Sequence, residues 1–179
     1  GVQWCEATLG ITPGPGGQHA LMGTHNRLFK IASQNFPQAY FEIIAIDPAA
    51  QAPARRRWFD MDDPSLRDRV RSAGPQLVHF VASVPDASAG VAGLKTLGLD
   101  RGVVLQASRP GAHGLLQWQI TVRADGQRLF NGCLPTLIQW GDTHPTQAMP
   151  DSGVMLQALR VTHPQAQTLG RAFQTIGLA

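Results

Sequence analysis

Apolar and polar residues alternate along the segment LLQWQITVR, which spans Leu115 to Arg123. One set of alternate positions holds Leu116, Trp118, Ile120 and Val122, and the other holds Gln117, Gln119, Thr121 and Arg123. A period of two residues is typical of an antiparallel strand with one face in the core and the other in water. The pattern therefore predicts a half-buried strand over 115–123, followed by a turn at 124–126, where the sequence reads Ala-Asp-Gly.

Further strands are predicted where short apolar runs lie between turn residues. These runs are 25–32, 39–46, 77–84, 102–108, 132–140 and 154–161. Three helical patterns end alike, in Thr-Leu-Gly at 8–10, Thr-Leu-Gly at 96–98 and Thr-Ile-Gly at 175–177. A glycine just after the last turn is a common helix end. Two of these three units follow the order strand, turn, helix and glycine, which indicates an internal repeat.

The first repeat has no strand before its helix, because the chain begins within the helical pattern of Val2, Cys5 and Leu9. We expect that a strand preceding residue 1 is missing from this chain, and that further chain follows the last helix. The predicted fold class is α+β, with paired βαβββ modules that form a cupped mixed or antiparallel sheet. One domain over 1–179 is expected, with a first module in 1–62, a second in 75–142 and an extra strand–helix unit in 150–179.

Composition and charge narrow the class of protein. The chain has 179 residues, of which 43% are hydrophobic and 15% charged, as in a globular domain. The net charge is +3, but the basic residues are scattered outside 55–57 and 67–71 and are not interleaved with aromatic residues, so no nucleic-acid partner is expected. Cys5 and Cys133 have neither metal-ligand spacing nor a disulfide framework. Without an apolar run long enough to span a bilayer or a visible signal peptide, a cytoplasmic protein with no membrane partner is expected.

Several segments resemble the glyoxalase-like domain family of the vicinal-oxygen-chelate superfamily. They are GGQHALMGTHNRLFKIA with AYFEIIAIDP in the first half, LVHFVASVPD at the start of the second half, and LPTLIQWGDTHP with GVMLQALRVTHP towards the end. The resemblance covers most of residues 1–178 and is weakest over 55–73. It implies two βαβββ modules around a small cavity. In enzymes of that superfamily, substrates with adjacent oxygens chelate a divalent metal.

The resemblance also implies ligands for such a metal (Zn, Ni, Fe or Mn) at Glu42, His79 and Gln139, with a fourth from the strand expected before residue 1. No nucleotide cofactor is expected. Glu42 lies on an otherwise apolar strand face, where a carboxylate is costly unless it is paired or bound to a metal. The alternative for Glu42 is a carboxylate satisfied by an arginine or by the backbone, and for His79 a core histidine. Gln139 stands where an acidic ligand is expected and brings no negative charge.

His25 opens a strand at a position that is not a metal-ligand position in the superfamily. It is predicted to contact substrate or to act as an acid or base in catalysis, beside Asn26; the alternative is that it fastens a loop. Trp118 is predicted to line the cavity, or else to belong to the core. Arg109 is predicted to bind an anionic substrate, or else to lie in a surface turn.

The function predicted from this resemblance is a small-molecule enzyme of the glyoxalase-like type, with Glu42 and His25 as catalytic residues. Its chemistry would be metal-dependent isomerase, lyase or dioxygenase chemistry on a small metabolite with vicinal oxygens. A protein that binds or sequesters a small molecule without turnover is the first alternative, and a structural member that serves dimerisation is the second. A homodimer is expected, because cupped sheets with open edges tend to pair.

Overall fold

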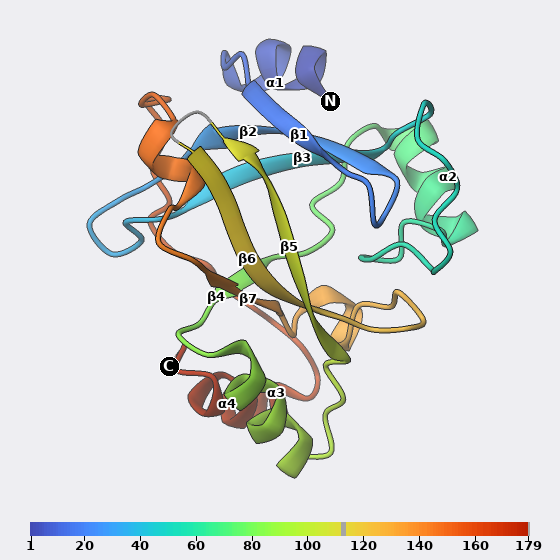
Figure 1. The fold of residues 1–179 in the computed structure, drawn as a ribbon, viewed down its shortest axis with the longest axis vertical. Coiled ribbons are helices and arrows are strands. Elements are labelled where there is room, and N and C mark those ends of the chain that lie inside the picture. Colours follow the sequence, from blue (N-terminus) through green and yellow to red (C-terminus); the bar gives the residue numbers. More distant parts are fainter. Residues whose placement is uncertain (112–113, 179) are drawn as a thin grey trace.

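The computed structural model describes residues 1–111 and 114–178, and its first half is a helix over a three-stranded sheet. Helix α1 (Val2–Leu9) precedes the antiparallel strands β1 (Gly14–His19), β2 (Thr24–Lys30) and β3 (Tyr40–Ile46), in the order β1-β2-β3. Helix α1 lies on the outer face of this sheet (Figure 1). It packs there because Cys5 and Ile11 form a small core with Phe29 of β2. Helix α2 (Pro64–Ala73) follows, capped by the Asp63 side chain.

The second half is a complete βαβββ module. Strand β4 (Val81–Ser83) leads through helix α3 (Ala87–Thr96) to β5 (Val103–Gly111), β6 (Gly114–Val122) and β7 (Thr136–Trp140). Their order in the sheet is β4-β7-β6-β5, with β4 parallel to β7 and the other pairs antiparallel. Short 3₁₀ helices, η1 (Phe130–Gly132) and η2 (Pro145–Ala148), flank β7. Mixed and antiparallel sheets with helices confirm the predicted α+β fold class.

The two sheets face each other, with α1 on the outer side of the first sheet, α3 and α4 on the outer side of the second, and α2 off to one side (Figure 1). Met22, Trp58 and Ile120 belong to the core between the sheets. On the far side of the second sheet, α3 packs against α4 (Ala166–Thr175) around Leu94 and Leu169. None of the helices in the described residues is long and apolar enough to cross a membrane.

Two differences from the sequence-based expectations concern strands. Strand β1 was not predicted, because its GPGGQH sequence has no apolar alternation. The strand predicted over 154–161 is absent from the described structure, which has an extended segment there. Leu156 donates its N–H to Ile31 O and accepts a hydrogen bond from the Ser33 hydroxyl, so this segment lies beside the end of β2. Only its helix, α4, corresponds to the predicted strand–helix unit.

Candidate functional site

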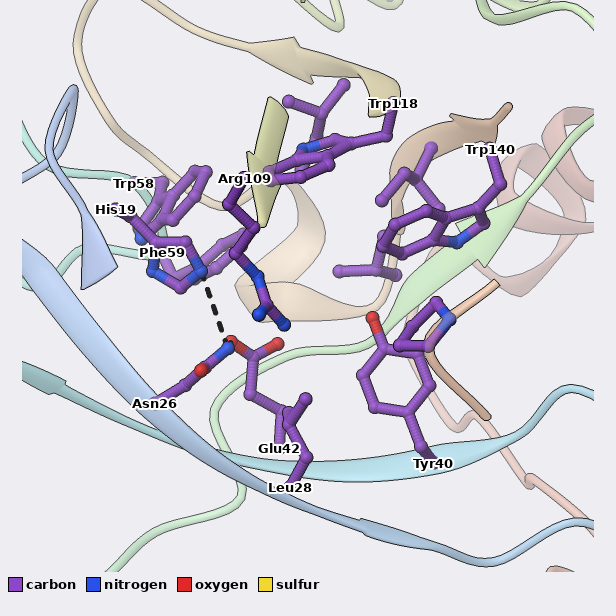
Figure 2. A pocket seen from close by; sticks show the side chains of 14 residues that line it. His19, Asn26, Leu28, Tyr40, Glu42, Trp58, Phe59, Arg109, Trp118 and Trp140 are labelled. Atoms are coloured by element: carbon purple, nitrogen blue, oxygen red, sulfur yellow. Dashed lines mark hydrogen bonds between the residues drawn. The ribbon is translucent and has the colours of Figure 1, made fainter. Parts of the chain in front are cut away.

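A pocket of about 50 Å³ lies between the two sheets. The first sheet contributes mainly polar side chains and the second mainly apolar ones, and the loop after β3 contributes an aromatic pair (Figure 2). The residues that line it are His19, Asn26, Leu28, Tyr40, Glu42, Trp58, Phe59, Val81, Arg109, Trp118, Ile120, Ile138, Trp140 and Pro145. The predicted cavity between the modules therefore exists. The wall from the first sheet carries polar side chains that could take part in a reaction, and the wall from the second sheet limits which ligands fit.

Glu42 is the carboxylate of the polar wall. Asn26 Nδ2 donates to Glu42 Oε1 at 2.6 Å, and the Gly17 N–H donates to Asn26 Oδ1 at 2.8 Å, so the backbone of β1 fixes the amide that holds the carboxyl group. Burial raises the pKa of Glu42, while the Asn26 hydrogen bond and the charge of Arg109 oppose that shift. A carboxyl group whose pKa is raised can both accept and return a proton closer to neutral pH than a free one.

His19 completes the polar wall as a neutral side chain. Its Nδ1 lies 3.0 Å from Thr24 Oγ1, and its Nε2 lies 3.4 Å from Asn26 Nδ2. Burial lowers the pKa of His19 to about 4, with smaller contributions from the charges of Arg109 and His25. A neutral ring that accepts from Asn26 must carry its proton on Nδ1 and donate it to Thr24. His19 therefore orients Asn26, which in turn orients Glu42.

Arg109 brings a positive charge into the pocket from strand β5. Its guanidinium points toward the Glu42 carboxyl group (Figure 2), although the two form no direct ion pair among the described residues. Arg109 can reach this place because Gly17 has no side chain: a Cβ there would lie 2.9 Å from Arg109 Cδ. An arginine held apart from the neighbouring carboxyl group is free to bind an anionic ligand.

The opposite wall is aromatic. Trp118 and Trp140 are cross-strand partners on β6 and β7, with ring centroids 5.5 Å apart. The Tyr40 hydroxyl points toward this wall from β3 (Figure 2). Burial, and then the neighbouring Glu42, raise the pKa of Tyr40, so its hydroxyl keeps its proton and can donate it in a hydrogen bond.

The glycines of β1 give a testable prediction about this site. A Cβ at Gly16 would lie 2.0 Å from the backbone oxygen of Asn26, so we expect Gly16→Ala to shift β2 and to lower the free energy of unfolding by about 1–3 kcal/mol. Urea denaturation measures this change. Gly14→Ala is the matched control, because its Cβ would meet Leu28 O at an ordinary 3.4 Å. Equal stability of the two variants would contradict the prediction.

The structure brings together Glu42, Asn26, Trp118 and Arg109 of the predicted site residues. His25 lies apart from them, because it is exposed and alternates with Asn26 along β2, so its side chain lies on the outer face of the sheet. It is not among the residues that line the pocket. The catalytic and substrate-binding roles predicted for His25 are therefore not part of the function proposed below.

His79 is held by hydrogen bonds on both ring nitrogens. Nδ1 lies 3.0 Å from Gly132 O, while Nε2 accepts from the Thr136 N–H at 3.1 Å and lies 3.0 Å from Thr136 Oγ1. Burial lowers the pKa of His79 to about 3, and the charge of Arg101 adds to this effect. His79 is thus a neutral side chain that ties the start of β4 to β7, and neither nitrogen is available to a metal in this arrangement.

Gln139 lies on the helix side of β7, whereas its neighbours Ile138 and Trp140 line the pocket. Its Oε1 accepts from the Ala87 N–H at the start of α3. Among residues 1–111 and 114–178, no three His, Cys, Asp or Glu side chains form a group that could hold a metal ion. The ligand set implied by the family resemblance therefore does not fit this arrangement, in which only Glu42 of the three faces the pocket.

The role of His79 predicts a pH dependence of stability. The pKa of His79 is lower in the folded chain than the ordinary 6.5. Its contribution to the free energy of unfolding is therefore present above pH 6.5 and is lost as the pH falls towards 3. We expect His79→Asn to reduce the acid-side slope of the unfolding free energy by about 1.4 kcal/mol per pH unit. Urea denaturation at several pH values between pH 7 and pH 4 measures this slope. The exposed His25→Asn is the control, and equal slopes for both variants would contradict the prediction.

Several pocket residues were not predicted from the sequence: His19, Tyr40, Trp58 and Phe59. The glycine-rich GPGGQH stretch could have pointed to His19, because glycines in a strand often mark a close approach of other groups. Phe59 and Asp60 have positive φ values of 58° and 57°, which non-glycine residues seldom adopt and sequence alone does not indicate. This bend places the stacked rings of Trp58 and Phe59 at the floor of the pocket.

Comparisons with known proteins show which family this chain belongs to. The search of curated proteins gives no match. Among solved structures, a variant of Streptomyces coelicolor methylmalonyl-CoA epimerase in complex with 2-nitronate-propionyl-CoA is similar, with 17% identity, a TM-score of 0.41, and coverage of 77% of this chain and 85% of that chain. A methylmalonyl-CoA epimerase in complex with methylmalonyl-CoA and ammonium is similar at 16% identity and a TM-score of 0.43, with 83% and 88% covered. The profile of the glyoxalase-like domain family matches residues 1–177. The chain therefore belongs to the glyoxalase-like domain family.

Proposed function

We propose that this chain is a glyoxalase-like enzyme that moves a proton on a small carbonyl compound with vicinal oxygens. The observation that carries the proposal is Glu42, whose carboxyl group is held by Asn26, faces Arg109 and has a raised pKa in a small pocket. Glu42 would remove a proton from the carbon next to the carbonyl group and return it to the same or the adjacent carbon. Arg109 would stabilise the negative charge that develops on oxygen.

The size of the pocket limits the substrate. A cavity of about 50 Å³ takes about three to five water-sized groups. Arg109 favours an anion, and the aromatic wall of Trp118 and Trp140 favours a flat or apolar remainder. The substrate class that fits is a short carboxylate with a neighbouring carbonyl or hydroxyl oxygen.

The alternative is a binding protein without turnover. It is supported by the aromatic wall, because planar side chains around one arginine can hold an anionic ligand without any group that exchanges protons. In that case Glu42 would only contribute a hydrogen bond to the ligand.

Proton exchange with solvent separates the two functions without knowledge of the product. The chain is incubated in D₂O with a panel of short 2-oxo, 2-hydroxy and 3-oxo carboxylates. Proton NMR then follows binding by saturation transfer and chemistry by loss of the carbon-bound proton signal. The proposed enzyme exchanges the proton of at least one bound compound. Binding without exchange, unchanged in Glu42→Gln, would support the binding protein instead.

A further inference from the structure

A second cavity, of about 10 Å³, lies behind the aromatic pair of the pocket. Trp58 and Phe59 line both cavities and so form the wall between them. The other side of this small cavity is formed by strands β6 and β7 and by Arg101, just before β5. Its size corresponds to about one water-sized species.

Arg101 is the unusual group in this cavity, because it is a buried cation without a paired carboxylate. The side chain is only 3% exposed. Its Nη2 donates to Thr136 Oγ1 at 2.6 Å, but its Nε and Nη1 are buried with no hydrogen-bond partner among the described residues. An unpaired charge taken out of water costs several kcal/mol, so a partner is expected.

The nearby acidic residues are already engaged with another arginine. Asp125 accepts from Arg123 at 2.6 Å, and Asp100 Oδ2 lies 3.5 Å from Arg123 Nη1. Neither aspartate forms an ion pair with Arg101 in the described structure. Both aspartates favour the charged form of Arg101 from a distance and so oppose the fall in its pKa that burial causes. Neither contacts the guanidinium, so its Nε and Nη1 keep no hydrogen-bond partner among the described residues.

The other buried polar side chains that line the cavity are Thr121, Thr136 and Trp58. Thr121 Oγ1 accepts from the Leu137 N–H, so its hydroxyl hydrogen remains available. The Trp58 indole N–H is buried and has no acceptor among the described residues. The Thr136 hydroxyl oxygen already accepts from Arg101 and lies 3.0 Å from His79 Nε2. The cavity therefore offers unused donors from Arg101, Thr121 and Trp58, which are the groups that an anion needs.

We propose that the cavity beside Arg101 binds a small inorganic monoanion of the halide class, such as chloride. A single monoanion would balance the buried guanidinium and accept from Arg101 Nε and Nη1 and from the Thr121 hydroxyl. The proposal is independent of the proposed function, because the two cavities are separated by Trp58 and Phe59. Occupation of this site would support Trp58 and Phe59, which also line the larger pocket.

Thermal unfolding in matched salts tests the proposal. The melting temperature is measured in sodium gluconate with increasing replacement by sodium chloride or bromide at constant ionic strength. A ligand at about 100 times its dissociation constant is expected to raise the melting temperature of a domain of this size by about 5–10 °C, with saturation. Arg101→Met should lose this response and Arg67→Met, on the exposed surface of α2, should keep it.

A direct measurement covers the case in which Arg101→Met does not fold. The chloride NMR linewidth is titrated with the unmodified chain, and bromide is added as a competitor. Saturable broadening that bromide reverses, and that Thr121→Val weakens, is the expected result. Equal melting temperatures in gluconate and chloride, with no saturable broadening, would overturn the proposal and assign the cavity to water.

Discussion

Replacing Glu42 with glutamine is expected to lower the rate of proton exchange by about 10²- to 10⁴-fold, the usual contribution of a positioned acid or base. Glutamine has the same shape and can still accept the 2.6 Å hydrogen bond from Asn26, so the pocket should keep its form and its ligand affinity. What it lacks is a proton-accepting carboxylate. The measurement is the initial rate of deuterium incorporation into a compound that the unmodified chain exchanges.

Glu6→Gln is the matched control, because Glu6 is the other glutamate of the chain and lies exposed on α1. It should exchange at the unmodified rate. The pH profile gives a second criterion: since Glu42 must be ionised to accept a proton and its pKa is raised, the rate should climb with pH through a range above the ordinary 4.5. A fast Glu42→Gln variant, or one that keeps this rise, would show that another group moves the proton.

Ionisation of Glu42 raises the expected rate as the pH rises, but it lowers the stability of the folded chain. The folded chain holds the proton of Glu42 more tightly than the unfolded chain does. The contribution of this proton to the free energy of unfolding is therefore present below pH 4.5 and is lost as the pH rises through the raised pKa. Glu42→Gln cannot ionise and should escape this loss. Loss of activity in a variant that is equally or more stable at neutral pH would therefore reflect chemistry and not unfolding.

The second large effect is expected at Arg109. Arg109→Met should weaken the binding of an anionic ligand by about 10²- to 10³-fold, because removal of one partner of a buried charge pair costs 2–5 kcal/mol or more. It should also raise the pKa of Glu42, since Arg109 lowers that pKa in the unmodified chain. Ligand titration by NMR and the pH–rate profile measure the two effects separately.

Arg27→Met is the control for the loss of a positive charge. Arg27 is exposed on β2 at a position that alternates with the pocket residues Asn26 and Leu28, so it lies on the outer face. This variant should bind the ligand with unchanged affinity. If Arg109→Met bound anionic ligands as tightly as Arg27→Met, Arg109 would have no role in recognition.

The strands that the sequence predicted best are those with one buried face and one exposed face. Strand β6 has Leu116 and Ile120 buried on one face and Leu115 and Gln117 exposed on the other, so the period of two could be read from its sequence. The segment 154–161 has similar apolar content, yet Met155 and Leu159 are exposed, and the segment joins the first sheet through the Leu156 N–H to Ile31 O bond without forming a strand. Apolar composition alone does not show whether a strand has a neighbour. The expected homodimer also stays a prediction.

The candidate site was predictable only in part, for a reason visible in β2. Leu28 faces the pocket and Phe29 faces α1, and both are buried. Because each face of this strand meets a core, the apolar pattern did not tell which of His25 and Asn26 points inward. A shift of one residue exchanges the two faces. Similarly, the partners that occupy His79 and Gln139 come from loops and helix ends that the sequence pattern does not place.

The two walls of the pocket come from different sheets, and this separation has a consequence for how the protein can change. The chemical groups Asn26 and Glu42 belong to the first module, while the shape of the cavity is set largely by Trp118, Ile138 and Trp140 of the second. Substitutions on β6 and β7 can therefore enlarge or narrow the cavity without disturbing the proton-transfer group. A domain built in this way can acquire new substrates through β6 and β7 while Glu42 and Asn26 on the first sheet, with Arg109 on β5, keep the reaction, and directed evolution of this chain should begin at Trp118 and Trp140.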